Sequence, residues 1–441
     1  MKRDRKKRYN AFITFVTLAV LAAGWLLRGP ASGALTELLP NVAEMCRRLG
    51  AWLYAVGGLI CVACLLVWCV HHKAHWGIRY AVNHAVLISG IERALLEAGT
   101  GYSISGDEGY VDLPIVKVEL SKDLIRGIVK IRNHIKYDSK LETTNLSPSM
   151  GRYIVTNTYL SDDENWYIYE FVDSLVDNQL IFNSYQEFAK YAHKFSDYQL
   201  FMDKQNVVPL SSLLLVGATG SGKTYALYSL IYQMINWKIK PELYFADPKN
   251  SSLCVLGKRI ASERTAGTPE GIITLLEKFG QCMEERKEEL QSKLEEKLDA
   301  DYRHWSLPAH VFIFDEFAAF QSAVATMDKK QRDKVSMLLR NIVLQGRQLG
   351  FFLWAIMQKS DSTDIPTAIR DNLIWKVVLG SATNTTYITC FEHSADLPKR
   401  NFKPGQGLYS YQGLTMKPQI TSFPTLNFDI LAAIIKETER E

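Results

Sequence analysis

The sequence has no large excess of charge of either sign. Its 441 residues include 51 lysines and arginines and 47 aspartates and glutamates, which gives a formal net charge of +4. Six of the basic residues lie within the first eight positions, so the rest of the chain is close to neutral. This balance excludes a protein that is positively charged over its whole surface, and any contact with nucleic acid must be local.

Cysteine is also scarce, and seven cysteines are too few for a disulfide-stabilised scaffold of this length. Cys61 and Cys64 form a C-x-x-C pair inside an uncharged apolar segment, which favours membrane-helix cysteines over a redox pair. His71, His72 and His75 follow this segment without a cluster of carboxylates or thiolates. They therefore indicate polar residues beside a membrane rather than a metal site.

Two uncharged apolar segments, residues 11–27 and 51–70, approach the roughly 20 helical residues that a bilayer core about 30 Å thick requires. We therefore predict a membrane anchor over residues 11–70, with two transmembrane helices joined by an exposed loop over residues 28–50. The basic tail over residues 1–10 favours a cytoplasmic N-terminus. Two spans return the chain to the cytoplasm, so we expect a multi-pass protein of the cell membrane with its remaining residues in the cytoplasm.

A cleaved signal peptide is the alternative for the first apolar segment. Ala31, Ser32 and Gly33 are small enough to form a cleavage site. However, the apolar segment is longer than the roughly 7–15 residues that are usual in a signal peptide. Even after such a cleavage, the second apolar segment would still anchor the chain.

The rest of the chain divides into three regions by its patterns. Residues 71–110 are expected to form a juxtamembrane helix and a linker, and residues 111–205 a small α+β module that is β-rich up to about residue 172. From 206 to 441, wholly apolar runs alternate with segments of helix length, which predicts an α/β domain with a mostly parallel sheet. The runs are Leu213–Val216, Leu243–Ala246, Val311–Phe314, Phe351–Met357 and Ile374–Leu379.

The residues that directly follow these runs indicate a site. Gly217, Asp247, Asp315 and Gln358 come after the first four runs. In open α/β sheets, ligands bind beyond the carboxyl ends of the strands. We therefore expect these four residues to meet at one edge of the sheet.

Gly217 is the first residue of a stretch, Gly217–Thr224, that matches the phosphate-binding pattern G-x-x-x-x-G-K-S/T. Glycines allow backbone N–H groups to point at phosphate oxygens. We expect Lys223 to bind the β- and γ-phosphates of ATP and the Thr224 hydroxyl to bind Mg²⁺. The nucleotide-binding residues are Gly217, Ala218, Thr219, Gly220, Ser221, Gly222, Lys223 and Thr224.

The acids after the third run complete the predicted catalytic site. We assign Asp315 to the Mg²⁺ ion and Glu316 to the general base that polarises the attacking water. The alternative is that Asp315 only caps the next helix. Gln358 is expected to sense the γ-phosphate or to orient the water, although a glutamine at a strand end is weak evidence alone.

Together these stretches resemble the FtsK/SpoIIIE family of DNA-pumping ATPases over about residues 205–415. The resemblance implies a RecA-like P-loop NTPase, preceded here by two transmembrane helices and a small β-rich module, with ATP and Mg²⁺ as cofactors. Besides the phosphate loop, the matching stretches are Asp247–Lys249, Met283–Arg286, Phe314–Ala318, Gly346–Gly350 with Ala355–Gln358, and Gly405–Tyr409.

The departures from the family narrow the expected function. Gln358-Lys359-Ser360 stands where the family has Gln-Arg-Pro, and only about 30 residues follow Tyr409, too few for a terminal winged-helix module. This layout resembles the coupling ATPases of conjugative plasmids and integrative elements of Gram-positive bacteria, which feed DNA into a transfer channel. The alternatives are a translocase for chromosome segregation, a protein-export ATPase of the type VII kind and a nucleotide-gated scaffold.

The resemblance also implies partners. It implies a homo-hexameric ring in which each site is completed by a neighbour, with relaxosome or transfer-channel proteins as further partners. Arg347 is our first candidate for a charge supplied in trans, followed by Arg340 and Arg370, although each arginine could instead form a surface salt bridge. DNA of either strandedness would be bound without sequence specificity. Its candidate contacts are Lys249, Lys258, Arg259, Lys329, Lys330, Arg332, Lys334 and Lys359.

Overall fold

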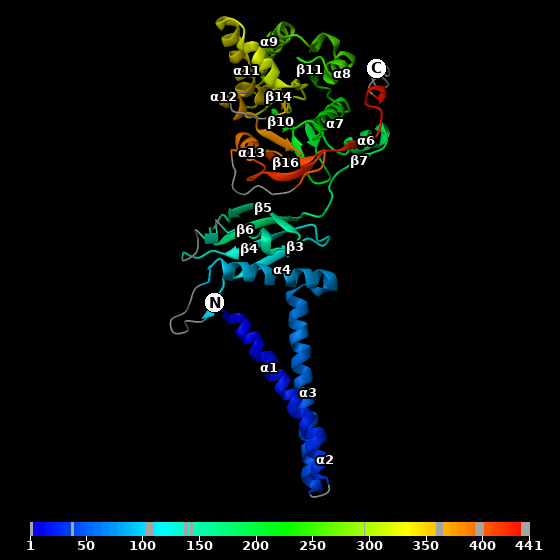
Figure 1. The fold of residues 1–441 in the computed structure, drawn as a ribbon, viewed down its shortest axis with the longest axis vertical. Helices are drawn as coiled ribbons and strands as arrows, with labels where there is room; N and C mark the ends of the chain where they lie inside the picture. Colours follow the sequence, from blue (N-terminus) through cyan, green and yellow to red (C-terminus); the bar gives the residue numbers. More distant parts are fainter. Residues whose placement is uncertain are drawn as a thin grey trace. The chain divides into compact units, whose positions relative to one another are not determined.

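The chain divides by its internal contacts into two compact units, Met1–Val176 and Asp177–Glu441. We call them the N-terminal unit and the C-terminal unit and describe each by itself (Figure 1). The computed structural model describes residues 3–36, 39–101, 110–135, 140–141, 144–294, 296–358, 365–392 and 401–433. Lys359, one of the candidate DNA contacts, lies outside the described residues.

The N-terminal unit begins with two long helical segments. The first comprises α1 (Arg5–Leu26), a π-helical turn (Leu27–Ala31) and α2 (Ser32–Leu35), and the second is α3 (Pro40–His71). Among the described residues, these two segments are long and apolar enough to cross a membrane. The loop predicted over residues 28–50 is wrong, because most of this stretch continues the two helices. Pro40 lies in the first turn of α3, where a missing N–H is tolerated.

Small residues let α1 and α3 pack closely. Ala43, Gly50 and Gly57 are buried on α3 and follow one another at seven-residue intervals, so they form a single seam on the helix. A Cβ atom added to Gly50 would lie 2.8 Å from the backbone nitrogen of Arg28 and 2.9 Å from the carbonyl oxygen of Gly24. The seam therefore requires glycine where the two backbones approach each other.

The rest of this unit is the expected β-rich module. Its antiparallel sheet has the order β3-β4-β6-β5. One face packs against α4, which buries Leu87 and Ile91 beside Val129 and Tyr169. The module thus includes α4, which the sequence analysis placed in a separate region. The elements are η2 (Ala74–Trp76), α4 (Ile78–Glu97), β3 (Val116–Leu120), β4 (Arg126–Arg132), η3 (Ser147–Ser149), β5 (Tyr153–Leu160) and β6 (Trp166–Asp173), and β1 (Arg3–Asp4) pairs with β2 (Tyr110–Val111).

The C-terminal unit contains a segment that the sequence analysis assigned to the small module. Phe188 and Phe201 are fully buried in the same core as Leu230, so residues 177–205 pack with the ATPase-like region. The boundary predicted at residue 205 is therefore misplaced, because irregularly spaced aromatic residues such as these do not indicate in the sequence which of two cores they pack into. The elements outside the main sheet are β7 (Ile181–Phe182), α6 (Tyr185–Ala192), β8 (Gln199–Phe201), β9 (Val207–Pro209) and β18 (Thr425–Leu426).

The main sheet confirms the α/β prediction. Its order is β12-β11-β13-β14-β10-β15-β16-β17, parallel as far as β15 and antiparallel in the last two strands. The strands are β10 (Leu213–Gly217), β11 (Glu242–Ala246), β12 (Thr265–Ala266), β13 (His310–Phe314), β14 (Phe351–Met357), β15 (Trp375–Leu379), β16 (Gln406–Tyr411) and β17 (Gln419–Ser422).

Helices cover both faces of this sheet, which explains why the strands are apolar throughout. Leu213 on β10 lies in one core with Leu230, whereas its neighbour Leu214 lies in the other core with Phe279 and Leu339. The helices are α7 (Lys223–Ile235), α8 (Ser252–Ile260), α9 (Pro269–Leu294), α10 (Phe317–Ala325), α11 (Lys329–Leu349), α12 (Thr367–Arg370) and α13 (Asn384–Phe391).

Candidate nucleotide site

The strand order brings the predicted site residues to one edge of the main sheet. Neighbouring strands β11, β13, β14 and β10 run parallel, and their registers pair Ala246 with Phe314 and Val216 with Met357. The residues that follow these pairs therefore leave the sheet at the same edge. They are Asp247, Asp315, Gly217 and Gln358.

The phosphate loop connects β10 to α7, and two of its glycines are required by its backbone. Gly220 and Gly222 have φ angles of 82° and 94°, in the left-handed region that favours glycine. The side chain of Lys223 donates hydrogen bonds to the carbonyl oxygens of Gly217 and Ala218. Residues 218–220 are exposed, so this stretch of the loop is open to a ligand from solvent.

The residue that precedes β16, Gly405, contacts the phosphate loop. The backbone N–H of Gly405 donates to the carbonyl oxygen of Ser221 at 2.8 Å. A Cβ atom on Gly222 would lie 2.5 Å from the Gly405 nitrogen, so this contact also requires glycine. The sequence contains the late Gly405–Gly407 motif, but no spacing along the chain predicts that it contacts the phosphate loop.

Asp247 holds the loop that leads into α8. It is almost fully buried, and its carboxylate accepts hydrogen bonds from the backbone N–H groups of Lys249, Ser251 and Cys254. The Ser251 hydroxyl lies 2.8 Å from Oδ2 of Asp247 and 3.4 Å from Oδ2 of Asp315, so it links the two carboxylates. Ser251 is a site residue that the sequence analysis missed, because serine in a loop carries no specific signal.

Asp315 lies at the end of β13, close to two other carboxylates. Burial raises its pKa, and the nearby charges of Asp247 and Glu316 raise it further, against the opposing effects of the Ser251 hydrogen bond and the Lys223 charge. A divalent cation would relieve this crowding of negative charge. The described residues contain no group of three or more His, Cys, Asp or Glu side chains arranged for a metal, but Mg²⁺ needs only one or two protein ligands beside nucleotide phosphates.

The helix-cap alternative for Asp315 is wrong, because Glu316 and not Asp315 occupies the N-cap position of α10, where it makes no side-chain hydrogen bond to the helix. Glu316 has a φ angle of 57°, a left-handed conformation that is uncommon outside glycine and often marks functional sites. Its Oε2 lies 3.1 Å from Nζ of Lys249, in an ion pair in which the lysine is half-exposed. Burial lowers the pKa of Lys223, and the charges of Glu316 and Asp315 oppose this shift.

The predicted polar and arginine residues lie in different places. Gln358 is exposed at the carboxyl end of β14. Arg347 is exposed in the last turn of α11, which leads through Gly350 into the amino end of β14. It therefore lies at the sheet edge opposite its own phosphate loop. Arg340 is exposed on α11, and Arg370 is mostly buried and ion-paired with its neighbour Asp371 at 3.4 Å.

Two of the candidate DNA contacts already have acidic partners. Lys249 pairs with Glu316, and Lys334 lies 2.6 Å from Glu277. The remaining described candidates are exposed on two helices: Lys258 and Arg259 at the end of α8, and Lys329, Lys330 and Arg332 at the start of α11.

Comparison with known proteins adds one sequence relative. The chain is 30% identical over 182 residues to the FtsK domain-containing protein YdcQ of Bacillus subtilis (strain 168), a match that covers 40% of this chain and 36% of that protein. The resemblance to FtsK domains is confirmed. The matched segment thus spans about a third of the relative's length. No family model matches the chain.

Solved structures show more distant likenesses. The pCW3 conjugation coupling protein TcpA, in a monomer form with ATPγS, is 15% identical with a TM-score of 0.49, over 80% of this chain and 99% of that chain. EssC (ATPases 2 and 3) from Geobacillus thermodenitrificans is 14% identical with a TM-score of 0.42, over 60% of this chain and 51% of that chain.

Proposed function

We propose that this protein is a membrane-anchored, ATP-driven DNA translocase, the coupling ATPase that feeds DNA into a conjugative transfer channel. The observation that carries the proposal is the meeting of a phosphate loop, a partly buried Asp315 and an adjacent Glu316 at one sheet edge. This arrangement suits hydrolysis of a nucleoside triphosphate. DNA as the cargo follows from the FtsK-like motifs, and membrane attachment from the two apolar helical segments.

The residues have distinct roles in the proposed reaction. Backbone N–H groups of residues 218–223 and the Lys223 ammonium bind the phosphates of ATP. Thr224 and Asp315 would hold Mg²⁺, which would neutralise part of the phosphate charge. Glu316 accepts a proton from the water that attacks the γ-phosphorus, the bond to the β–γ bridging oxygen breaks, and ADP and phosphate leave. Gln358 orients that water from the adjacent strand.

The proposed assembly is a homo-hexameric ring in the cell membrane with the N-terminus and C-terminal unit in the cytoplasm. Because Arg347 is far from its own phosphate loop, it is suited to reach the site of a neighbouring subunit. Non-specific DNA phosphate contacts would come from the exposed bases of α8 and α11. Relaxosome or transfer-channel proteins would be the further partners.

The test is ATP hydrolysis by the purified full chain in detergent, without DNA and with single- or double-stranded DNA. We expect hydrolysis that DNA stimulates, and a loss of roughly a hundred-fold or more in Lys223→Ala. Hydrolysis that no DNA changes would contradict a DNA motor. A transfer assay in cells that carry Lys223→Ala then separates conjugation from the other uses of such a motor.

A further inference from the structure

Helix α4 has two apolar stripes, and only one is covered. Tyr80, Leu87 and Ile91 point into the core of the small module and are buried. Ile78, Val82 and Val86 lie on the opposite side of the helix, one turn apart, and their side chains are 69%, 47% and 66% exposed. A helix that packs on a sheet normally presents polar residues outward, so this second stripe requires an explanation.

The position of α4 points to what covers the stripe. The apolar segment α3 ends at His71, and α4 begins only seven residues later, at Ile78. His72 and His84 bring the end of α3 against α4, with their Nδ1 atoms 3.0 Å apart. Figure 1 shows α4 running across the end of α3, with the small sheet on its other side. Because the buried stripe packs on the sheet, the exposed stripe on the opposite face of α4 points to the side on which α3 lies.

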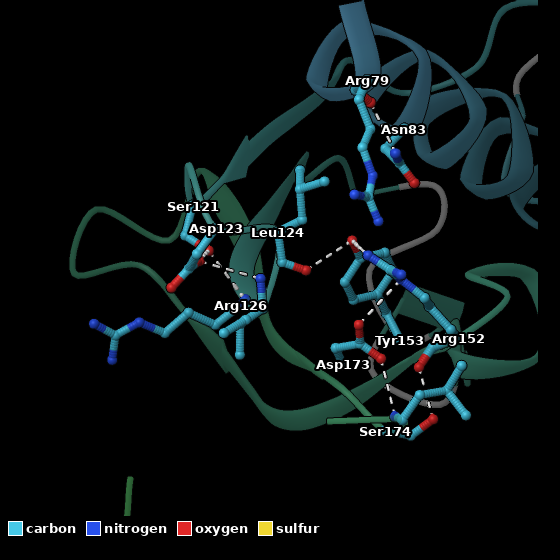
Figure 2. A network of polar contacts seen from close by, with 12 residues as sticks. Arg79, Asn83, Ser121, Asp123, Leu124, Arg126, Arg152, Tyr153, Asp173 and Ser174 are labelled. Atoms are coloured by element: carbon cyan, nitrogen blue, oxygen red, sulfur yellow. Dashed lines mark hydrogen bonds and ion pairs between the residues drawn. The ribbon is translucent and has the colours of Figure 1, made fainter. Parts of the chain in front are cut away.

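Aromatic and basic residues border the stripe. Trp76 is 39% exposed, and two ammonium groups lie over its ring, Lys73 at 5.0 Å and Lys122 at 5.1 Å. Arg79 and Arg126 lie at the same end of the module, beside the turn between β3 and β4 (Figure 2). A tryptophan flanked by basic side chains is typical of a residue at the boundary between lipid and water.

The acidic groups at this end are already engaged within the module. The Asp123 carboxylate accepts hydrogen bonds from the Ser121 hydroxyl and the backbone N–H of Ile125. The Asp173 carboxylate lies 3.1 Å from Nε of Arg152 and is buried (Figure 2). The four basic residues at this end outnumber these two carboxylates, so the border of the stripe carries a net positive charge, which complements anionic phospholipid headgroups.

We propose that α4 lies in the plane of the membrane surface and inserts Ile78, Val82 and Val86 at the boundary between headgroups and acyl chains. Lys73, Lys122 and Arg79 contact anionic headgroups beside it. The proposal rests on α3 crossing the membrane, as in the proposed function. It gives the small module a fixed orientation on the bilayer, which a single flexible connection to α3 would not provide.

The experiment measures where single nitroxide labels lie relative to lipid. The full chain, with its seven native cysteines replaced, is reconstituted into nanodiscs of phosphatidylcholine with phosphatidylglycerol. Labels are placed through Val82→Cys or Val86→Cys. Ile135→Cys is the matched control, because this residue is 96% exposed and follows β4 at the end opposite the turn between β3 and β4. Leu59→Cys, 70% exposed in the middle of α3, reports on the span itself.

We expect the labels at 82 and 86 to be reached by oxygen and shielded from a water-soluble nickel complex, and the label at 135 to show the reverse. Equal access of the nickel complex to all three positions would overturn the proposal. So would shielding at 82 and 86 from both reagents, which would mean that a protein covers the stripe, or shielding that appears only when DNA is added. A label at position 59 that is open to nickel would instead contradict the membrane anchor of the proposed function.

The electrostatic part has a separate test. In nanodiscs with phosphatidylglycerol, Lys73→Gln with Lys122→Gln should make the label at 82 shallower and more open to nickel. In phosphatidylcholine alone, the same pair of changes should have little effect. An unchanged depth in both lipids would overturn the role of the lysines.

Discussion

At the scale of single residues, the most informative group is the Asp315 carboxyl. Burial and the charges of Asp247 and Glu316 raise its pKa, so the folded protein binds this proton more tightly than the unfolded chain does. The contribution of Asp315 to stability is therefore highest in acid and is lost as the pH rises through the raised pKa. At neutral pH the ionised group opposes folding.

The first prediction follows from this sign. Asp315→Asn should raise the melting temperature of the nucleotide-free chain at pH 7.5 while abolishing Mg²⁺-dependent hydrolysis. A gain on the order of 1 kcal/mol would amount to about 2–4 °C in a domain of this size. The gain should shrink as the pH is lowered through the raised pKa of Asp315. Asp333→Asn, an exposed position on α11, is the control, and an equal or lower melting temperature for Asp315→Asn at pH 7.5 would contradict the account.

The second prediction concerns Lys249, whose ion pair holds the expected general base. The pair is half-exposed on the lysine side, and such pairs contribute at most about 1 kcal/mol, so a DNA phosphate can displace the carboxylate easily. Lys249→Gln should therefore raise hydrolysis in the absence of DNA by up to about five-fold and weaken its stimulation by DNA.

Lys258→Gln, an exposed lysine on α8, is the matched control for Lys249→Gln and should leave DNA-free hydrolysis unchanged. Steady-state rates with and without DNA decide the question. A fall in DNA-free hydrolysis with unchanged nucleotide affinity would show that Lys249 supports the chemistry instead of restraining Glu316.

The phosphate loop and the two acids can be singled out in the sequence because each consists of residues that are adjacent along the chain, and the strand order brings them to one sheet edge as expected. Contacts between distant segments were not predictable. The ion pair of Lys249 with Glu316 and the contact of Gly405 with Ser221 each join different loops, and neither partner carries a signal for the other. The stretch Asp247–Lys249 could be singled out from the sequence, but the partner of its lysine could not.

At the scale of elements, the hydrophobic pattern of the sequence predicts the strands of the main sheet but places the ends of the two long N-terminal helices wrongly. Strands buried on both faces are apolar throughout, which marks them clearly in the sequence. The charged residues within 28–50 favour a loop, yet Glu44 and Arg48 lie one turn apart on α3 and form an ion pair at 3.1 Å. Charges at the end of a membrane helix are compatible with helix, so their presence alone does not predict where it ends.

The third prediction tests the seam between α1 and α3. Gly50→Leu should separate the two helices, because even a Cβ atom at this position lies within 2.9 Å of backbone atoms of α1 and its connection. Gly58→Leu on the same helix meets nothing within 4 Å and is the matched control. The readout is cross-linking of a Leu21→Cys and Gly57→Cys pair in a chain without its native cysteines.

Cross-linking should persist in the Gly58→Leu background and fall several-fold in the Gly50→Leu background. Equal yields in both backgrounds would show that the seam does not hold the helices together. The comparison separates packing from helix propensity, because both changes replace glycine by leucine in one helix.

At the scale of the whole molecule, the fourth prediction concerns Arg347, which lies at the sheet edge opposite the phosphate loop of its own subunit. Lys223→Ala and Arg347→Ala subunits should each be inactive alone, yet equal mixtures should recover hydrolysis. Random mixing in a closed ring gives about a quarter of the interfaces an intact Lys223 facing an intact Arg347. Arg340→Ala should keep activity by itself. Mixtures that stay inactive would rule out the role in trans.

The fifth prediction concerns DNA affinity. The chain is close to neutral beyond its basic tail, so DNA contacts must come from a few local bases. Affinity should fall linearly on a log–log plot against salt and differ little between unrelated sequences. The measurement is DNA binding by fluorescence anisotropy between about 50 and 200 mM salt. Over this range, a protein with about 6–10 phosphate contacts loses roughly 10³–10⁵ in affinity. A strong preference for one DNA sequence would contradict the non-specific phosphate contacts of the proposed function.

The end of the chain has a mechanical consequence. Strand β18 pairs with β7 near the beginning of the C-terminal unit, and Gln179 also donates to the carbonyl oxygen of Phe423. Phe423 in turn donates to Gly405, which donates to Ser221 in the phosphate loop. Gln179, at the beginning of the C-terminal unit, is thus three hydrogen bonds from the phosphate loop. If the proposed ring pulls on DNA, tension on the segment that joins the two units would act three hydrogen bonds from the phosphate loop.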